Sequence, residues 1–426
     1  MNKQILKLAI PNIISNITIP LSATIDTALM GHLSSRHLGA IALGSMIFTF
    51  LYGSFNFLRM GTTGMVAQSY GKADQLEVTL TLYRALILAV LIALLVVLFQ
   101  KPILHLAIMT LNGSELSSLI TEYFNTRVFA VLGAMINFVL VGYYFGVSNS
   151  ITPLIMTVVI NLSNATLSYI FVYHLDMGIS GVALGTLISQ YLGVMIGVYY
   201  LKDYFLQKVS FDEVVQKEKL LNFFHINKDI FVRTIALTGS LSLFYSFSSA
   251  HSQTTLAVAT IMMGFMTWMA YAIDGFANAT ESLVGRYFGA KESENLYRAI
   301  KLSLFYGFVG SLLFGLVYLI FTKELGEIFT TDGQTIKKLL EYRWLLFLFP
   351  LISFMAFIFD GVFVGMTKTK VLRDSVLLGA VGFVTVFYSL KSFDYEFWLF
   401  SSFLLFFAIR GVYLVGWFLR WQKKEL

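Results

Sequence analysis

Long apolar segments alternate with short polar connections along the whole chain. An apolar run of about 20 residues is long enough to cross the hydrocarbon core of a bilayer as an α-helix. Breaks at polar, glycine and charged clusters predict twelve such helices, at residues 5–31, 38–69, 78–100, 122–147, 152–174, 178–204, 228–250, 254–288, 296–321, 338–366, 370–391 and 395–420. These segments leave no room for a soluble domain, so the pattern predicts an all-α polytopic membrane protein.

The composition agrees with this pattern. Hydrophobic residues make up 57% of the chain and charged residues 13%, which is about half the charged share of an average soluble domain. The chain has no cysteine, which excludes disulfides, thiol chemistry and cysteine-ligated metals. The net charge of +6 is spread over the loops and not gathered in one basic tract, so we expect no nucleic-acid partner.

Lysine and arginine residues in the loops predict the orientation of the chain, because short cytoplasmic loops are enriched in them. Twenty of these residues, Arg233 among them, fall at the two termini or in the loops that follow even-numbered helices, against seven on the other side. Both termini are therefore predicted to lie in the cytoplasm. We expect a multi-pass protein of a bacterial or archaeal cytoplasmic membrane.

One long polar connection follows the sixth predicted helix and divides the chain in two. We expect an N-terminal six-helix lobe at residues 1–204, a cytoplasmic linker at 205–227 and a C-terminal six-helix lobe at 228–426. The division places the same number of helices on each side of the linker. The two halves can therefore be compared directly.

The two halves also resemble each other in sequence. VAQSYGKAD (66–74) aligns without gaps on VGRYFGAKE (284–292) at an offset of 218, and residues 122–150 align on 341–369 at an offset of 219. Two matches at nearly one offset indicate duplication of a six-helix unit. Two copies with the same topology imply a pseudo-twofold axis along the membrane normal and a central cleft where a substrate binds.

One carboxylate, Asp26, lies in the apolar stretch 19–31 of the first predicted helix. Charge in hydrocarbon is costly, so an aspartate there must face protein or water and be paired or protonated. Pro11 and Pro20 precede it, and a proline in a helix interior removes a backbone hydrogen bond and bends the helix. The first helix is therefore predicted to be a hinged element that carries a proton- or cation-binding group.

Three polar residues share one face of the eighth predicted helix. Asp274, Asn278 and Glu281 follow one another at i, i+4 and i+7, a spacing that places them on one side of an α-helix. Two carboxylates on one face inside the membrane predict that this face lines the cleft or the interior of the C-terminal lobe. Glu281 has the alternative of lying near the cytoplasmic interface and only snorkelling or capping there.

Arg59 is the one basic residue deep in the second predicted helix. At the offset of 218 it corresponds to Ala277, at the depth between Asp274 and Glu281 in the other half. We therefore consider a gate in which Arg59 meets one of these acids across the pseudo-twofold axis. A static role within its own helix is the alternative.

Asp360, in MAFIFDGVFVG of the tenth predicted helix, is a fourth acid inside the membrane. It is either a second titrating site or a structural hydrogen-bond acceptor. The fifth predicted helix carries Asn161, Asn164 and Ser168 within two turns, and Thr186 follows in the sixth. Such small polar residues commonly form hydrogen bonds between membrane helices, so by themselves they do not define a site.

Six segments together resemble the multidrug and toxic compound extrusion (MATE) family, and the last two resemble its DNA-damage-inducible branch: DTALMGHL, FLRMGTTGMVAQSYG, NLSNATLSYIFV, GISGVALGTLIS, DGFANATESLVGRYFGA and FDGVFVGMTKTKVLRDS. The resemblance spans nearly the whole chain and implies twelve helices in two lobes. It further implies export of amphipathic, often cationic compounds, coupled to inward flow of H⁺ or Na⁺. By the family's motifs, Asp26 is central to coupling, and Asn164, Ser168 and Thr186 form the polar network of the N-terminal lobe.

One position departs from the family pattern, because relatives commonly have an aspartate where this chain has Ser168. A carboxylate pair binds Na⁺ well or shares a proton, whereas one carboxylate among neutral oxygens forms a weaker cation site and still titrates. We therefore favour H⁺ over Na⁺, with Asp26 as the binding group for either ion. Protonation from outside would neutralise Asp26 and allow the helix to bend at Pro11 or Pro20. Apart from substrate, ion and lipids, we expect no cofactor, no other metal site and a monomer.

Other functions fit the sequence less well. A lipid-linked or other small-molecule flippase of the same superfamily should carry several cationic residues along its cleft, and here only Arg59 meets that condition. A major-facilitator transporter should have a basic signature between its second and third helices, which GKADQLE does not match. A membrane-embedded enzyme is disfavoured because no HExxH metal motif, GxGD-type aspartyl pair or nucleophile elbow occurs. The sequence therefore predicts a secondary transporter and not an enzyme.

Overall fold

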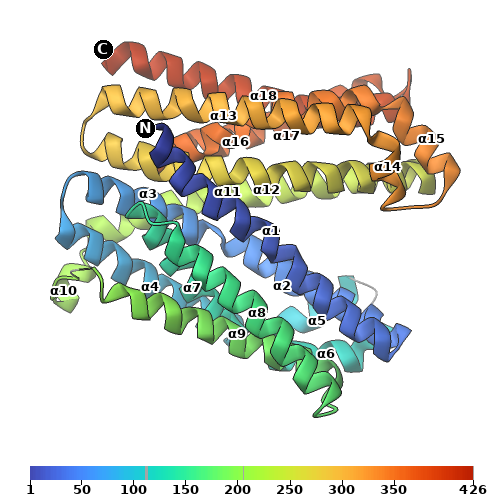
Figure 1. Ribbon diagram of the computed structural model, residues 1–426, viewed down its shortest axis with the longest axis horizontal. Coiled ribbons are helices and arrows are strands. Elements are labelled where there is room, and N and C mark those ends of the chain that lie inside the picture. Colours follow the sequence, from blue (N-terminus) through green and yellow to red (C-terminus); the bar gives the residue numbers. More distant parts are fainter. Residues whose placement is uncertain (111–113, 205, 426) are drawn as a thin grey trace. The chain divides into compact units, whose positions relative to one another are not determined.

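A computed structural model describes residues 1–110, 114–204 and 206–425, which form helices joined by short connections (Figure 1). Among these residues, eleven helices are long and apolar enough to cross a membrane. A further pair, α6 and α7, passes the same test together and is bent by 51° at a short break, which brings the number of spans to twelve. The prediction of an all-α polytopic membrane protein is confirmed.

The helices group into two compact units. Residues 10–224 form one, which we call the N-terminal unit, and residues 1–9 with 225–426 form the other, the C-terminal unit. Both boundaries fall inside continuous helices, α1 and α11. The predicted linker, residues 205–227, includes the short helix α10 and the start of α11.

The N-terminal unit contains the helices that precede the linker. The predicted helix 38–69 is two helices that break at Asn56, and the predicted helix 122–147 is the bent pair of α6 and α7. The elements are α1 (Asn2–Leu33), α2 (Ser35–Phe55), α3 (Phe57–Gly71), α4 (Gln75–Leu98), α5 (Gln100–Thr110), the 3₁₀ turn η1 (Ser114–Leu116), α6 (Ser117–Arg127), α7 (Ala130–Gly146), α8 (Ile151–Tyr173), α9 (Gly178–Leu201) and α10 (Phe211–Val214).

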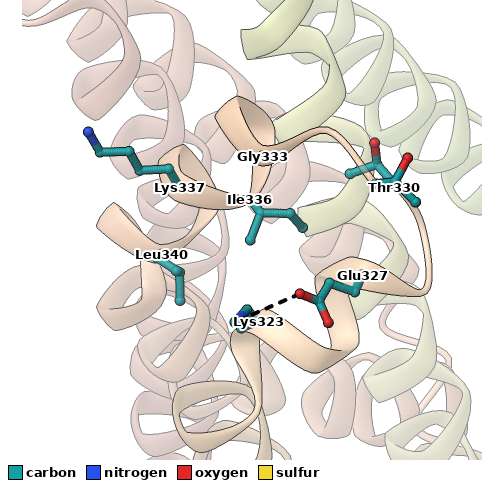
Figure 2. Close-up of a pocket in the computed structure, with 8 residues that line it drawn as sticks. Lys323, Glu327, Thr330, Gly333, Ile336, Lys337 and Leu340 are labelled. Carbon is teal, nitrogen blue, oxygen red and sulfur yellow. Dashed lines mark ion pairs between the residues drawn. The ribbon is translucent and has the colours of Figure 1, made fainter.

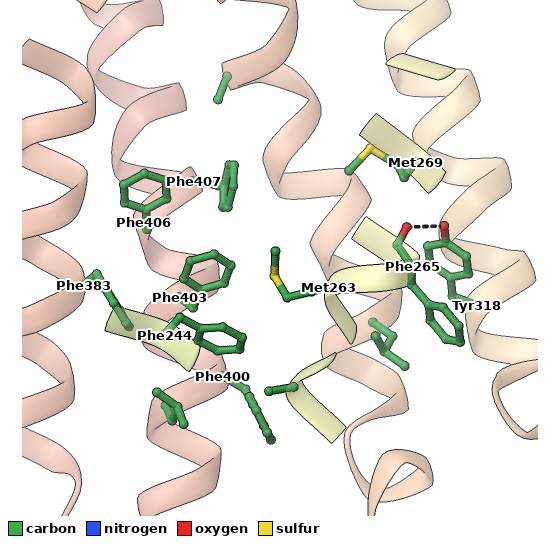
Figure 3. Close-up of a cluster of buried hydrophobic side chains, with 14 of the residues drawn as sticks. Phe244, Met263, Phe265, Met269, Tyr318, Phe383, Phe400, Phe403, Phe406 and Phe407 are labelled. Atoms are coloured by element: carbon green, nitrogen blue, oxygen red, sulfur yellow. Dashed lines mark hydrogen bonds between the residues drawn. The ribbon is translucent and has the colours of Figure 1, made fainter. Parts of the chain in front are cut away.

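The C-terminal unit has a core rich in phenylalanine (Figure 3). Phe244 of α11 stacks on Phe403 of α18 with ring centroids 4.3 Å apart, and Tyr318 of α13 donates a 2.6 Å hydrogen bond to the carbonyl of Phe265 in α12. Such buried rings pack against one another over large apolar areas, and these contacts hold the helices together. The elements are α11 (Lys217–His251), α12 (Gln253–Gly289), α13 (Ser293–Ile320), α14 (Thr322–Glu327), α15 (Gly333–Glu341), α16 (Arg343–Gly365), α17 (Thr369–Leu390) and α18 (Tyr395–Glu425).

The two units repeat the same close helix contact. In the N-terminal unit, a Cβ atom on Gly142 of α7 would lie 2.5 Å from the carbonyl oxygen of Arg59 in α3. In the C-terminal unit, a Cβ atom on Gly361 of α16 would meet the carbonyl oxygen of Ala277 in α12. These glycines are related by the offset of 219 and their partners by the offset of 218. Small residues allow backbones of membrane helices to approach this closely, so the duplicated sequence preserves one packing solution in both units.

The helix ends repeat as well. Ala73, after α3, and Lys291, after α12, both have left-handed backbone conformations, with φ of 57° and 59°. Ser148, after α7, and Thr367, after α16, have φ of 60° and 53°. The first pair is related by an offset of 218 and the second by 219. A residue with positive φ commonly terminates a helix, and side chains other than glycine are unusual there. These four non-glycine residues with positive φ, which match in two pairs between the units, support a duplication.

The segment that follows α9 is attached to the N-terminal unit by Arg84 of α4. Its Nε donates to the carbonyl of Val214 at 3.0 Å and its Nη2 to the carbonyl of Glu213 at 3.1 Å, while Nη1 pairs with Glu77 at 2.8 Å. Ser210 and Glu213 form a capping box at the start of α10, and the hydrogen bonds from the Ser210 backbone and side chain lower the pKa of the Glu213 carboxyl. The linker is therefore anchored at its middle and not only at its ends.

We predict that Gly361→Ala lowers the stability of the full-length protein in detergent by about 1–3 kcal/mol, because the new methyl group would collide with the backbone of α12 and force α12 and α16 apart. The measurement is thermal or chemical unfolding of the purified protein. Gly239→Ala in α11 is the matched control, because a Cβ atom there meets nothing within 4 Å. Equal stability of the two variants would contradict the proposed contact.

Candidate functional site

A polar network joins α8 and α9 in the N-terminal unit. The side-chain amide of Asn164 in α8 donates to the hydroxyl of Thr186 in α9 at 3.1 Å and to that of Ser168 at 3.4 Å. Thr186 in turn donates to the carbonyl of Val182 at 3.1 Å. All three network side chains are buried. The structure thus brings together the three polar residues that the family motifs single out.

Asp26 of α1 belongs to the same cluster. Its exposed fraction is 7%, and the side chains of Ser168 and Asn164 hydrogen-bond to its carboxylate. The other carboxylate oxygen, Oδ1, is buried and has no hydrogen-bond partner. A buried carboxylate oxygen without a donor is costly, so this atom is a natural acceptor for a proton or another cation. The cluster therefore combines one titratable group with neutral hydroxyl and amide groups.

Glycine allows α8 and α9 to approach at this cluster. A Cβ atom on Gly185 would lie 2.7 Å from the hydroxyl of Ser168 and 2.8 Å from its backbone nitrogen. In the motif GVALGTLIS, the residue before Thr186 is Gly185, because a side chain there would prevent α9 from passing this close to α8. The polar network is held in register by this close contact.

Arg127 is a member of the site that the sequence interpretation missed. It is the last residue of α6, at the bend before α7, and its guanidinium lies 4.9 Å from the ring centroid of Phe48 and 5.2 Å from that of Tyr123. From there its charge acts on Asp26. An arginine inside the apolar segment EYFNTRVFAVLG was the available signal, since charge in a spanning segment usually marks function.

Arg59 lies in α3, and its guanidinium is 5.9 Å from the ring centroid of Phe145 in α7. Its backbone carbonyl is the group that Gly142 approaches. The acids that we considered as its partners, Asp274 and Glu281, belong to the C-terminal unit. The gate between them stays a prediction.

The three polar residues of the eighth predicted helix all lie in α12 of the C-terminal unit. Asp274 and Asn278 are half-buried, whereas Glu281 is 1% exposed. A Cβ atom on Gly365 of α16 would lie 2.6 Å from the backbone carbonyl of Glu281, so α16 covers this turn of α12 closely. The alternative in which Glu281 snorkels to the interface is wrong, because its side chain is enclosed by the protein.

Asp360 of α16 is held by two arginines. Nη2 of Arg410 in α18 donates to both carboxylate oxygens, at 3.0 and 2.8 Å, and Nη2 of Arg233 in α11 donates to Oδ2. All three side chains are buried. Of the two alternatives for Asp360, the structure shows the hydrogen-bond acceptor, here as one member of an ionic triad.

This triad corrects one assignment made from the sequence. Arg233 was assigned to a cytoplasmic loop, but it lies inside α11 with 8% of its surface exposed. Like Arg59, the basic residues Arg127, Arg233 and Arg410 lie within helices. Position in a helical pattern alone did not distinguish a buried arginine from an interfacial one.

A cavity of about 560 Å³ lies elsewhere, between α14 and α15 of the C-terminal unit (Figure 2). Its wall includes an ion pair in which Nζ of Lys323 is 3.8 Å from Glu327. None of the predicted site residues lines it. Within the described part of the chain, no group of three or more histidine, aspartate or glutamate side chains is arranged to hold a metal ion.

Comparisons with known proteins place the chain among transporters. The MatE family model matches residues 11–170 and 230–387. The chain is 31% identical over 431 residues to DNA damage-inducible protein F of Escherichia coli, which covers 99% of this chain and 93% of that protein. It is 26% identical over 353 residues to the probable multidrug resistance protein NorM of Thermotoga maritima, covering 79% of this chain and 74% of that protein.

The fold also matches a solved transporter structure. The crystal structure of the Vibrio cholerae MATE transporter VcmN in the bent form is similar with a TM-score of 0.89 at 18% identity, covering 99% of this chain and 96% of that chain. The similarity in fold and the family match agree over both units. The prediction of a multi-pass transporter, and not an enzyme, is confirmed. The chain belongs to the MatE family, the multidrug and toxic compound extrusion transporters, in the branch of DNA damage-inducible protein F.

Proposed function

We propose that this transporter is an antiporter that exports amphipathic, often cationic compounds in exchange for inward-moving protons. The observation that carries the proposal is Asp26, a buried carboxylate with one unpartnered oxygen beside the hydroxyl and amide groups of α8 and α9. A group of this kind binds a proton more readily than an exposed carboxylate does. The similarity to the relative from Thermotoga maritima, a probable multidrug resistance protein, supports the substrate class.

The composition of the site favours H⁺ over Na⁺. A sodium site gains from several oxygen ligands and from a second negative charge, and this cluster has one carboxylate with Ser168 at the position of the usual aspartate. The guanidinium of Arg127 adds a positive charge that acts on Asp26. This charge opposes the uptake of either cation at Asp26, but a proton joins the carboxylate covalently and needs no further ligands, whereas Na⁺ does.

Coupling follows if the proton and the substrate prefer different conformations. Pro11 and Pro20 lie inside α1, on the N-terminal side of Asp26. Protonation would remove the charge on Asp26 and weaken its hydrogen bonds to α8, and the helix could then bend at a proline and repack. We propose that this repacking lowers substrate affinity on the outer side of a bacterial or archaeal cytoplasmic membrane, with both termini in the cytoplasm.

A second candidate keeps the same architecture with a different substrate. A lipid-linked or other small-molecule flippase should carry several cationic residues along its cleft, and the helices hold Arg127, Arg233 and Arg410 in addition to Arg59. The first proposal is preferred because Asp26 offers a built-in coupling group. A flippase that works without an ion gradient would leave this group unexplained.

We predict that Asp26→Asn abolishes proton-driven transport while the protein still folds, because the amide keeps the size of the carboxylate and cannot take up a proton. The measurement is uptake of the amphipathic cation ethidium into acid-interior proteoliposomes, with a Na⁺ gradient as the second condition. Wild type should respond to the pH gradient, and the variant should fall to the level of protein-free liposomes.

Asp176→Asn is the matched control, since Asp176 is exposed in a turn with φ of 49°, a conformation that asparagine accepts. It should transport like wild type. Proton-driven uptake that survives in Asp26→Asn would overturn the proposed role of Asp26. Uptake in wild type driven by Na⁺ alone would assign the coupling to sodium.

We predict that Ser168→Asp makes transport respond to a Na⁺ gradient, because a second carboxylate next to Asp26 creates a site with two negative charges. Ser168→Asn is the matched control, with the same size and no charge. Both variants add atoms where α9 passes close, so their folding is compared by thermal unfolding. A Ser168→Asp protein that folds and remains insensitive to Na⁺ would contradict the explanation of ion preference.

A further inference from the structure

The proton-coupling mechanism assigns no role to the Arg233–Asp360–Arg410 triad of the C-terminal unit. It joins α11, α16 and α18, and its three side chains meet through charge-assisted hydrogen bonds. Such bonds are strong when desolvated, but one carboxylate cannot neutralise two guanidinium groups. The triad therefore retains one net positive charge inside the protein.

Nearby acidic side chains compensate the net positive charge of the triad only weakly. The charged groups that act on Arg410 are Asp360 and Arg233. One turn along α11 from Arg233, Asp229 pairs with Arg373 of α17 at 2.7 Å, and Asp374 takes a further bond from the same arginine. These side chains are partly exposed, so their charges are screened and already committed to Arg373.

Two hydrogen-bond donors of the triad also lack an acceptor. The Nε atoms of both Arg233 and Arg410 are buried and have no hydrogen-bond partner. A buried donor that is left unsatisfied costs free energy, and here two such donors belong to groups with an excess of positive charge. An acceptor with a negative charge would satisfy both conditions at once.

Access to the triad is from one side. The side chains of Arg233 and Asp360 each keep 10% of their surface exposed, whereas that of Arg410 keeps 2%. Arg410 is covered by aromatic rings, with its guanidinium 5.5 Å from the ring centroid of Phe406 and 5.7 Å from that of Phe407. A ligand would therefore reach the triad at Arg233 and Asp360, whose side chains keep a small exposed surface.

We propose that Arg233 and Arg410 form a binding site for one anionic group, a phosphate, carboxylate or sulfonate carried by an amphipathic molecule, and that Asp360 is the internal anion that competes for it. The proposal rests on the transporter function and departs from the cationic compounds proposed above: the molecule bound at this site carries an anionic headgroup. Planar guanidinium groups suit this task because they bind phosphate and carboxylate oxygens in a fixed geometry.

The test is isothermal titration calorimetry of the full-length protein in dodecyl maltoside with three probes of equal chain length: octyl phosphate, octanoate and octyltrimethylammonium. Wild type should bind the two anions more tightly than the cation. Asp360→Asn should bind the anions about tenfold more tightly, because a competing charge is removed, and Arg410→Gln should bind them about tenfold more weakly. A triad that only clamps helices predicts the opposite for Asp360→Asn, namely lower stability with no gain in anion affinity.

Two control variants separate binding from folding. Arg343→Gln removes an exposed arginine at the start of α16 in the same unit, and it should leave anion affinity unchanged. Arg410→Lys keeps the charge but loses the forked geometry and should fall between wild type and Arg410→Gln. Thermal unfolding of each variant shows that it is folded; if Arg410→Gln does not fold, the gain expected in Asp360→Asn still decides the question.

Inorganic phosphate distinguishes the source of the anion. If it binds as tightly as octyl phosphate, the site takes a free anion; tighter binding of octyl phosphate assigns it to a headgroup. Equal affinities for the octyl anions and the octyl cation in wild type, with no change in Asp360→Asn, would overturn the proposal. Because the assay uses no gradient, Asp26→Asn should bind the anions like wild type, so failure of proton coupling and failure of the anion site remain separate results.

Discussion

The cost of charge inside a helix bundle is the constraint on which this structure depends. A charged side chain away from water must be paired, neutralised or bound to a ligand. The two units meet this requirement differently. In the N-terminal unit, neutral groups hydrogen-bond to Asp26, one of its oxygens has no partner, and Arg127 acts on it only through its charge. In the C-terminal unit, Asp360 is bound directly by Arg233 and Arg410. The first arrangement is suited to gaining and losing a proton, and the second pairs its carboxylate with two positive charges.

The duplication explains how two such different sites share one scaffold. The close contacts at Gly142 and Gly361, and the helix ends with positive φ, recur at the same offsets in both halves. The chemistry does not recur: at the offset of 218, Asp26 corresponds to Phe244, a residue of the aromatic core of the C-terminal unit. Backbone packing was retained after duplication, because small residues at the contacts are needed in each copy, while the polar positions diverged.

The N-terminal site and the C-terminal triad also suggest a division of tasks. A group that titrates must be able to change its charge without a large rearrangement, and the hydroxyl and amide partners of Asp26 can serve both protonation states. The two arginines around Asp360 are donors only, so they are matched to a negatively charged acceptor. This contrast makes the N-terminal unit the better place for ion coupling and the C-terminal unit the better place for recognition of a negative group.

The sequence by itself determined the class of protein, the number of spans, the duplication and the family, because apolar length, repeat offset and motif identity are local properties that no packing detail can reverse. It also singled out Asp26, Asn164, Ser168 and Thr186, which the structure brings into one cluster.

Only the tertiary structure decided which charges meet. Arg127, Arg233 and Arg410 are single basic residues in apolar segments, and nothing in their local pattern shows whether they face lipid headgroups, a loop or a carboxylate on another helix. The break at Asn56 and the bend between α6 and α7 were likewise not predicted, since each pair of helices together has the length and hydropathy of a single span. Pairing between side chains 50 or 127 residues apart depends on helix rotation and depth, which are set by packing against neighbours and not by the sequence of either helix alone.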